Sequence, residues 1–528
     1  MRLFRLFSPL VIALCFIARA QETAPVVPQI KVTSQLVVLD TVVTDRKGNI
    51  ITNLTKDDFT VYENGVLQTI RNFSAPADIP AVPNESTKDR NGHDNWGASP
   101  LTMIVVDEMD TPFEELAYAR DCVRNYLKRQ PAQLVEPTIL LWLNDGGFHP
   151  VTGFTRDRDA MLRALAKQPP SLAGRLARGA AAEEVSAAFA ALQQAALFSR
   201  GQPGKKEIIW VGRSFPSIDP IGLDDYQRTL LTKAVRSTVD LLLASRVSLY
   251  VIDPTITGSA INDDTPQEVD TLTPVPATTV TDPFAGTFNI NLFVSETGGR
   301  YFRGFNDLDH EIGESVQRGT QYYTLTYVPS TQIQDGSYRQ IDIRLRNPNL
   351  IAQTKKGYYT ERSEPEPQTK LTAKLDLTEL RFDLYEASTT GMQYTGIGVH
   401  VDGCTRDPDQ VSSMCAISVD TGSLTFTANE NGEERTTVIA VLASLDAKGK
   451  LINDTIHRLT IAIPSSQIGE IQSGHSTLHL HTIVPPVAHN LRVVVRDSSG
   501  RIGTTDLDAS IVPRIVASAA ALQKTRHN

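Results

Sequence analysis

The sequence lacks an excess of positive charge. Its 528 residues include 51 lysines and arginines against 60 aspartates and glutamates, which gives a net charge of -9. Sequence-independent binding to nucleic acid needs a basic face that neutralises phosphates. The composition therefore argues against a nucleic-acid partner and suits a soluble protein in an aqueous compartment.

A long apolar run is also missing at the N-terminus, where residues 10–17 are too few to span a bilayer comfortably. This run follows Arg2 and Arg5 and precedes a small-x-small pattern at residues 18–20. That order is typical of a cleaved secretory signal, although a retained anchor helix is the alternative. We predict that residues 1–20 are a signal peptide and that the protein is periplasmic or extracellular. No transmembrane segment is expected after cleavage.

Cysteine is scarce, and removal of the signal leaves only Cys122, Cys404 and Cys415. Cys404 and Cys415 bracket a short polar loop, so we expect them to form a local disulfide in an oxidising compartment. No second cysteine pair accompanies them, which disfavours a zinc site. Cys122 falls on a helical stretch and is expected to be a buried free thiol.

Familiar catalytic motifs are absent as well. The sequence contains no Gly-x-Ser-x-Gly elbow, no His-Glu-x-x-His helix and no Walker lysine. His479 and His481 would share one face of a strand, but no acidic or cysteine partner lies near them in sequence, so we interpret them as surface residues. We therefore expect a protein that is not an enzyme and has no catalytic residues.

A chain of 528 residues should divide into about three domains. The strand and helix patterns change along the sequence and indicate where these domains lie. Residues 30–75 read as an N-terminal β module, with a hairpin at Asn64-Gly65. Residues 76–100, rich in proline, asparagine and aspartate, read as a linker. In residues 101–320, continuous apolar runs alternate with segments whose apolar residues recur at helical intervals. This alternation predicts a mainly parallel sheet covered by helices on both faces.

The pattern returns to strands after this region. Residues 321–362 are expected to supply β strands that close the α/β domain or the N-terminal module. Residues 370–512 are almost wholly strand and turn, which is typical of a β-sandwich.

Several segments carry a resemblance to one family, and together they span roughly the first two thirds of the chain. The chain resembles secreted von Willebrand factor type A (VWFA)-related proteins of the acidobacterial type. The resemblance implies a doubly wound, mainly parallel α/β sheet of VWA or Rossmann-like type, flanked by all-β, immunoglobulin-like sandwich modules. It also implies a ligand site at the carboxyl edge of the strands, but no reaction. The matching segments are residues 35–45, 54–59, 63–65, 203–210, 250–254, 296–302, 322–327 and 356–359.

In such domains the carboxyl edge often holds a divalent cation, and this chain matches that site only in part. Asp107 stands where the first aspartate of the site belongs, Thr111 can replace its last serine, and Thr155 matches its second-loop threonine. Met109 stands where a hydroxyl is usual, and a thioether is a poor ligand for Mg²⁺. Residues 211–213, Val-Gly-Arg, replace the usual Thr-Asp-Gly.

Three interpretations of this degenerate metal-ion-dependent adhesion site stay open. Asp107, Thr111 and Thr155 could hold a weakly bound Mg²⁺, with Asp110 as a substitute ligand. Asp107 and Thr111 could instead cap the helix that follows. In the third interpretation Arg213 supplies the positive charge by pairing with Asp107 or Asp110. We favour no cofactor, with Mg²⁺ as the only candidate.

The functional hypothesis is an exported protein-binding or adhesion-type module. Its ligand-binding edge would comprise Asp107, Asp110, Thr111, Thr155 and Arg213, and its partner would be a protein. The alternatives are a structural or assembly component of the cell envelope and a hydrolase with unrecognised catalytic residues. An enzyme should show a deep pocket with a base near a nucleophile, whereas a binding protein should show a shallow rim.

Overall fold

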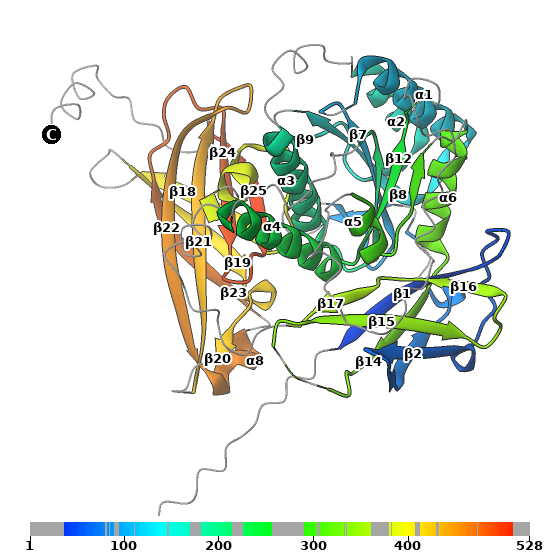
Figure 1. The fold of residues 1–528 in the computed structure, drawn as a ribbon. Coiled ribbons are helices and arrows are strands. Elements are labelled where there is room, and N and C mark those ends of the chain that lie inside the picture. Colours follow the sequence, from blue (N-terminus) through cyan, green and yellow to red (C-terminus); the bar gives the residue numbers. More distant parts are fainter. Residues whose placement is uncertain are drawn as a thin grey trace, which may run out of the picture.

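The computed structural model contains three packed parts, which are an N-terminal β module, an α/β domain and a C-terminal β module (Figure 1). The signal peptide predicted at residues 1–20 lies outside the residues that the structure describes. These are residues 36–79, 82–83, 85–88, 94–109, 111–144, 147–168, 181–213, 225–255, 290–303, 307–331, 333, 335–360, 380–381, 383–406, 412–428, 432–471 and 474–510.

The α/β domain is built on a seven-stranded sheet with the order β10-β8-β7-β11-β12-β13, in which β9 also pairs with β8. The strands from β8 to β13 in this order are parallel, and β9 and β10 run antiparallel to β8. Every residue of β7, β11 and β12 is buried, because helices cover both faces. The strands are β7 (Leu101–Asp107), β8 (Gln133–Asn144), β9 (Gly147–Pro150), β10 (Thr155–Asp157), β11 (Lys206–Val211), β12 (Val247–Asp253) and β13 (Tyr301–Arg303).

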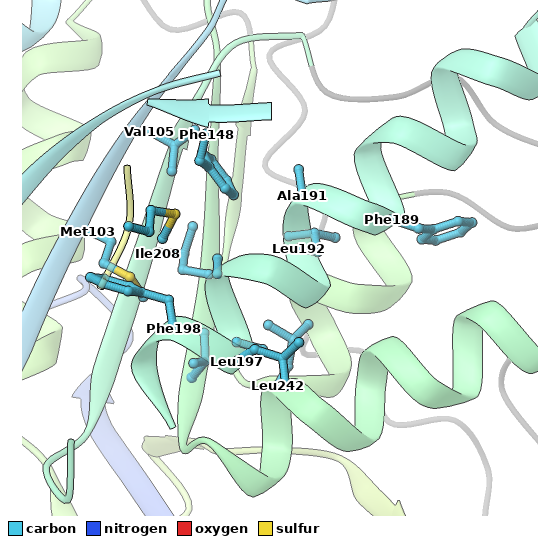
Figure 2. Packing of buried hydrophobic residues seen from close by; sticks show 14 of the residues in the cluster. Met103, Val105, Phe148, Phe189, Ala191, Leu192, Leu197, Phe198, Ile208 and Leu242 are labelled. Atoms are coloured by element: carbon cyan, nitrogen blue, oxygen red, sulfur yellow. The ribbon is translucent and has the colours of Figure 1, made fainter. Parts of the chain in front are cut away.

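Helices cover this sheet in two layers. Successive side chains of a strand point to opposite faces, so Met103 and Val105 pack in one apolar cluster while Ile104 and Val106 pack in the other. Figure 2 shows the first cluster, where strand residues meet Leu192 and Phe198 of the helical layer. That layer contains α3 (Ala181–Ser199), α4 (Asp225–Ala244) and α5 (Ile290–Glu296), and the opposite layer contains α1 (Phe113–Arg129), α2 (Arg158–Lys167) and α6 (Leu308–Thr320).

The N-terminal β module combines the start of the chain with strands that follow the α/β domain. Its two four-stranded sheets have the orders β16-β1-β14-β4 and β17-β15-β2-β3, and both contribute to one apolar core. Asn64 and Gly65 have positive φ values (46° and 77°) in the turn between β2 and β3, as the predicted hairpin requires. The strands are β1 (Val37–Asp45), β2 (Phe59–Glu63), β3 (Val66–Gln68), β4 (Ile70–Ser74), β14 (Tyr323–Tyr327), β15 (Tyr338–Leu345), β16 (Leu350–Gln353) and β17 (Gly357–Tyr359).

This module covers the amino end of the parallel sheet. Arg246, which precedes β12, forms a bidentate ion pair with Asp40 of β1 (2.7 and 3.0 Å). Gln353 of β16 donates to the carbonyls of Gly298 and Gly299 just before β13 (3.0 and 2.7 Å). The carboxyl ends of the strands therefore lie at the end of the sheet that faces away from this module.

The segment predicted as a linker, residues 76–100, is partly structured. It contains a single turn of 3-10 helix (Pro76–Asp78) and a two-stranded pair, β5 (Thr87–Lys88) and β6 (Asp94–Asn95). Trp96 is buried, and Arg156 donates to the carbonyl of Pro83 (2.7 Å). The described part of this segment is thus held against the α/β domain.

The C-terminal β module consists of a three-stranded sheet, β18-β19-β23, and a five-stranded sheet in which β21 pairs with β20, β22 and β24 and in which β24 pairs with β25. The two sheets enclose one apolar core, while an immunoglobulin-like strand arrangement remains a prediction. Val441, Val494 and Ile502 belong to the cluster of the α/β domain, so the two parts pack together. The strands are β18 (Val399–Arg406), β19 (Ser413–Asp420), β20 (Thr427–Ala428), β21 (Glu433–Leu445), β22 (Leu451–Pro464), β23 (His475–Thr482), β24 (Asn490–Arg496) and β25 (Ile502–Asp508), with a short helix α8 (Ile468–Ile471).

The predictions about cysteine hold. Cys404 and Cys415 occupy paired positions on β18 and β19 and form a disulfide. Cys122 lies on α1 as a buried free thiol, and burial is the main cause that raises its pKa to about 11. None of the described helices is long and apolar enough to cross a membrane.

Candidate functional site

The strand order places a topological switch point between β7 and β11. From β7 the chain moves through β8 to β9 and β10 on one side, then returns to β11 on the other side of β7. The segments after these two strands lead to helices on opposite faces, α1 after β7 and α4 after β11. In open α/β sheets, ligands bind in the crevice outside the carboxyl ends of the strands at such a point.

Asp107 is the last residue of β7 and is fully buried at this switch point. Its Oδ1 accepts a hydrogen bond from the backbone N–H of Met109 (2.9 Å), and its Oδ2 accepts one from the indole N–H of Trp210 on β11 (3.1 Å). The helix-cap interpretation does not hold for Asp107, because the N-cap position of α1 is Pro112 and Asp107 ends β7. Asp107 instead ties the end of β7 to β11.

Gly212 allows the segment after β11 to approach Asp107 and Thr111 closely. A Cβ atom at position 212 would lie 2.5 Å from the Cβ of Asp107 and 2.7 Å from the Oγ1 of Thr111. The next residue, Arg213, donates its backbone N–H to that same Oγ1 (3.0 Å). Position 212 is where the resemblance expects an aspartate, and a side chain of that size does not fit without a shift of the backbone.

The guanidinium group of Arg213 forms a bidentate ion pair with the carboxylate of Glu115. The Glu115 side chain is 8% exposed and that of Arg213 is 40% exposed. One of the three interpretations of the sequence paired Arg213 with Asp107 or Asp110. Its partner is instead Glu115, and Asp110 lies outside the described residues.

Glu115 is a residue of this edge that sequence reasoning missed. It lies in the first turn of α1, where a carboxylate also suits the positive end of the helix dipole. Glu115 falls on the same buried stripe as Ala119, Cys122 and Tyr126. An acidic residue at a core position of an amphipathic helix is the signal that could have identified it.

A second charged group lies at the ends of β12 and β13. Asp253 ends β12 and is buried, and its carboxylate accepts from the Tyr301 hydroxyl (2.7 Å) and lies 3.5 Å from Nε of Arg303. Burial, followed by the charge of Asp253, raises the pKa of Tyr301 well above its usual range, so the phenol stays protonated. The Arg303 side chain is 43% exposed. The edge therefore exposes two guanidinium groups whose carboxylate partners are buried.

Thr155 does not share this edge. It begins β10 and pairs with Thr138, which in turn pairs with Thr102 near the start of β7. Asp107 pairs with Leu143, five positions further along β8, or about 16 Å at the usual rise of a strand. The structure thus brings together Asp107, Thr111 and Arg213 and leaves Thr155 towards the amino end of the sheet.

A pocket of about 470 Å³ lies elsewhere, between the α/β domain and the C-terminal β module. Its wall includes the stacked rings of Phe154 and Phe198, whose centroids are 5.8 Å apart, and Met392. Its polar lining comes from Thr152, Gln202, Gln393 and Thr395. No lining side chain is an acid or base that titrates near neutral pH.

Comparisons with known proteins give little overlap: no protein-family model and no curated protein matches the chain. One solved structure, proximal thread matrix protein 1 from the mussel byssus, gives a TM-score of 0.21 at 11% identity over 30% of this chain and 38% of the mussel chain. This chain therefore spans less than half the length of the mussel protein.

Two other solved structures are manganese-loaded TRAP protein of Plasmodium vivax and the SpRpn10 VWA domain. The first gives a TM-score of 0.25 at 10% identity over 49% of this chain and 93% of that one. The second gives a TM-score of 0.15 at 14% identity over 30% of this chain and 89% of that one. Evidence for the α/β fold comes from the strand order of the sheet and its packing between two helical layers.

Proposed function

We propose that this is an exported protein-binding module of von Willebrand factor type A-like fold, which uses the carboxyl edge at the β7–β11 switch point to hold a carboxylate of a partner protein. The observation that carries the proposal is the pair of half-exposed guanidinium groups, Arg213 and Arg303, at that edge. A guanidinium presents several N–H donors that match a carboxylate. The buried Glu115 and Asp253 fix the two arginines in place.

The arrangement of the modules supports the choice of edge. The N-terminal β module covers the amino end of the sheet through contacts such as Arg246–Asp40. The loops that carry Thr111 and Arg213 lie at the opposite, carboxyl end. A partner that reaches the sheet would meet this end.

The described residues, which do not include Asp110, do not fit a Mg²⁺ ion of the adhesion-site type. Both carboxylate oxygens of Asp107 accept hydrogen bonds from protein N–H groups, and the hydroxyl oxygen of Thr111 accepts one from Arg213. A hard dication needs several oxygen ligands around one point, whereas Thr155 lies at a distance and position 212 has no room for a carboxylate. Arg213 supplies positive charge at this edge in the proposal.

The proposal assigns no catalytic role to this edge. At the edge, the Tyr301 phenol donates to Asp253 and stays protonated, so it is a poor nucleophile. The pocket of about 470 Å³ has no lining group that could act as a general base near neutral pH. Among the described residues, neither place brings together the adjacent base and nucleophile of a hydrolase.

The test is a pull-down from cell-envelope extract with the purified protein as bait, followed by binding measurements with the recovered partner. We expect Arg213→Ala and Arg303→Ala to weaken binding, each by about tenfold, because each removes a charge-assisted contact. Arg344→Ala is the matched control, since Arg344 is an exposed arginine of the N-terminal β module, 64% exposed. A chelator should leave binding unchanged. Binding that disappears with chelator and returns with Mg²⁺ would refute the proposed mode.

Export has its own test, independent of the partner. Native protein recovered from cells should begin at or near Gln21, as the order of charged, apolar and small residues before it predicts. A full-length cytoplasmic product would refute export and leave the binding edge unaffected.

A further inference from the structure

The longest described strand of the C-terminal β module, β22, has one edge without a partner strand. β21 pairs with β22 along its whole length, from Glu433↔Pro464 to Leu445↔Leu451. Within the described part of the chain, no strand pairs with the other edge. Figure 1 shows β22 at the margin of its module, with the α/β domain on the opposite side.

Side chains of β22 form hydrogen bonds with backbone carbonyls at the edge of β23. Asn453 and His457 reach across from β22 to the carbonyls of Ile483 and His481 (3.0 and 2.7 Å). Those carbonyls lie at the end of β23 and just beyond it, so they are satisfied without another strand. No described side chain makes an equivalent contact to the backbone of β22. An unpaired edge of this length is a template for strand addition.

The face of β22 that carries its even-numbered residues is exposed, and it includes Ile456, at 59% exposure, and Ile452, at 37%. Asp454 and Arg458 stand on the same face, two residues on either side of Ile456, and both are exposed. Neither forms an ion pair within the described residues. Exposed isoleucines on an open edge strand, flanked by unpaired charges of opposite sign, are unusual for a surface that stays in contact with water.

The exposed face of β22 is complementary to the same face of a second copy of β22. If a second β22 runs antiparallel with Ile456 opposite Ile456, then Asp454 of each strand lies opposite Arg458 of the other. Directly opposite residues on one face of an antiparallel pair have Cβ atoms about 5 Å apart, close enough for an apolar contact in the centre and an ion pair on each side. A twofold axis produces this arrangement, in which every contact occurs twice.

We propose that β22 pairs with β22 of a second copy of this chain, in the register centred on Ile456, and joins two five-stranded sheets into one continuous sheet. This surface lies on the C-terminal β module and is independent of the β7–β11 edge. The dimer is held by backbone hydrogen bonds between the two edges, by the Ile456 contact and by two Asp454–Arg458 ion pairs. The small contact area predicts a reversible equilibrium in the micromolar range or weaker.

The experiment is sedimentation of the purified protein from micromolar to several hundred micromolar. We expect the wild type to shift from monomer to dimer. Ile456→Lys places two like charges opposite each other and should weaken the dimer by about tenfold or more. Leu67→Lys is the matched control, since Leu67 lies on the edge strand β3 of the other β module and is 62% exposed. This control should dimerise like the wild type.

Charge reversal tests the register itself. Asp454→Arg and Arg458→Asp should each weaken the dimer, because each creates two like-charged pairs. The double variant, D454R together with R458D, should restore it, and an equimolar mixture of the two single variants should form a mixed dimer. Circular dichroism should show that every variant is folded, because all three side chains are exposed.

Three results would overturn the proposal. The first is a wild-type monomer at every concentration, which would leave the edge to a strand of a different protein. The second is a dimer that Ile456→Lys does not weaken. The third is a failure of the double variant and of the mixed single variants to dimerise while the folded wild type does.

Discussion

Trp210 and Asp107 join the two strands that border the switch point, through an indole N–H that donates to a fully buried carboxylate oxygen at 3.1 Å. The bond supplies a donor to one oxygen of a buried carboxylate, whose other oxygen accepts from the backbone N–H of Met109 (2.9 Å). Arg213, two residues after the end of β11, is 40% exposed beside this buried bond, and its backbone N–H donates to Thr111.

Trp210→Phe should lower the free energy of unfolding by more than the loss of ring volume explains. Trp142→Phe is the control, because Trp142 is equally buried on β8 but its indole nitrogen has no hydrogen-bond partner among the described residues. We expect the Trp210 variant to lose about 1–3 kcal/mol more than the Trp142 variant, since it leaves a buried carboxylate oxygen without a donor. Urea denaturation measures both. Equal losses would show that the bond contributes nothing to stability.

Gly212→Ala should destabilise the protein and weaken partner binding together. The new methyl group would collide with the Cβ of Asp107 and the Oγ1 of Thr111, and such overpacking typically costs about 1–3 kcal/mol. Gly153→Ala is the control, because nothing lies within 4 Å of a Cβ placed there. Thermal unfolding compares the two. A Gly212 variant as stable as the Gly153 variant would contradict the close approach of the two segments.

Replacing Cys404 and Cys415 with serine should cost about 2–3 kcal/mol, because the disulfide closes a loop between residues that are 11 positions apart. Reductant should lower the melting temperature of the wild type and leave that of the double variant unchanged. Peptide mapping without reductant should recover the linked pair. Two free thiols in native protein would show that the bond does not form in the cell and would also count against export.

Glu136→Gln should flatten the pH dependence of stability. Burial, with Glu207 nearby, raises the pKa of Glu136 from its ordinary 4.5 to about 8, so the folded protein keeps this carboxyl protonated where the unfolded chain ionises it. Its contribution to stability is fully present below about pH 4.5 and is lost as the pH rises towards 8.

The loss should reach at most about 1.4 kcal/mol per pH unit for this one group. Glutamine stays neutral and keeps an oxygen for the hydroxyl of Thr102, which donates to Glu136 at 2.7 Å. Urea denaturation at several pH values should show that the free energy of unfolding of the variant rises relative to that of the wild type as the pH rises. Glu114→Gln, at an exposed position of α1, should follow the wild type. A constant difference between Glu136→Gln and the wild type would contradict the raised pKa.

The sequence by itself determined the features that depend on local spacing. Residues 101–107 are apolar without interruption because helices bury both faces of a parallel sheet. The Asn64-Gly65 pair adopts the positive φ values that few other residues adopt. Cys404 and Cys415 flank a loop short enough to bring them together. Each of these follows from a period, a turn or a short separation that can be read directly from the chain.

Only the tertiary structure decided which distant side chains meet. The segment after β7 contains several acids, and the position of α1 on the sheet places Glu115, 98 residues away, against Arg213. Thr155 matched a motif, but the hairpin from β8 through β9 to β10 carries it back along the sheet and away from Asp107. Spacing along the chain sets the period of each element, whereas register and helix placement depend on packing between elements that are remote in sequence. The composition of the binding edge was therefore decided by packing.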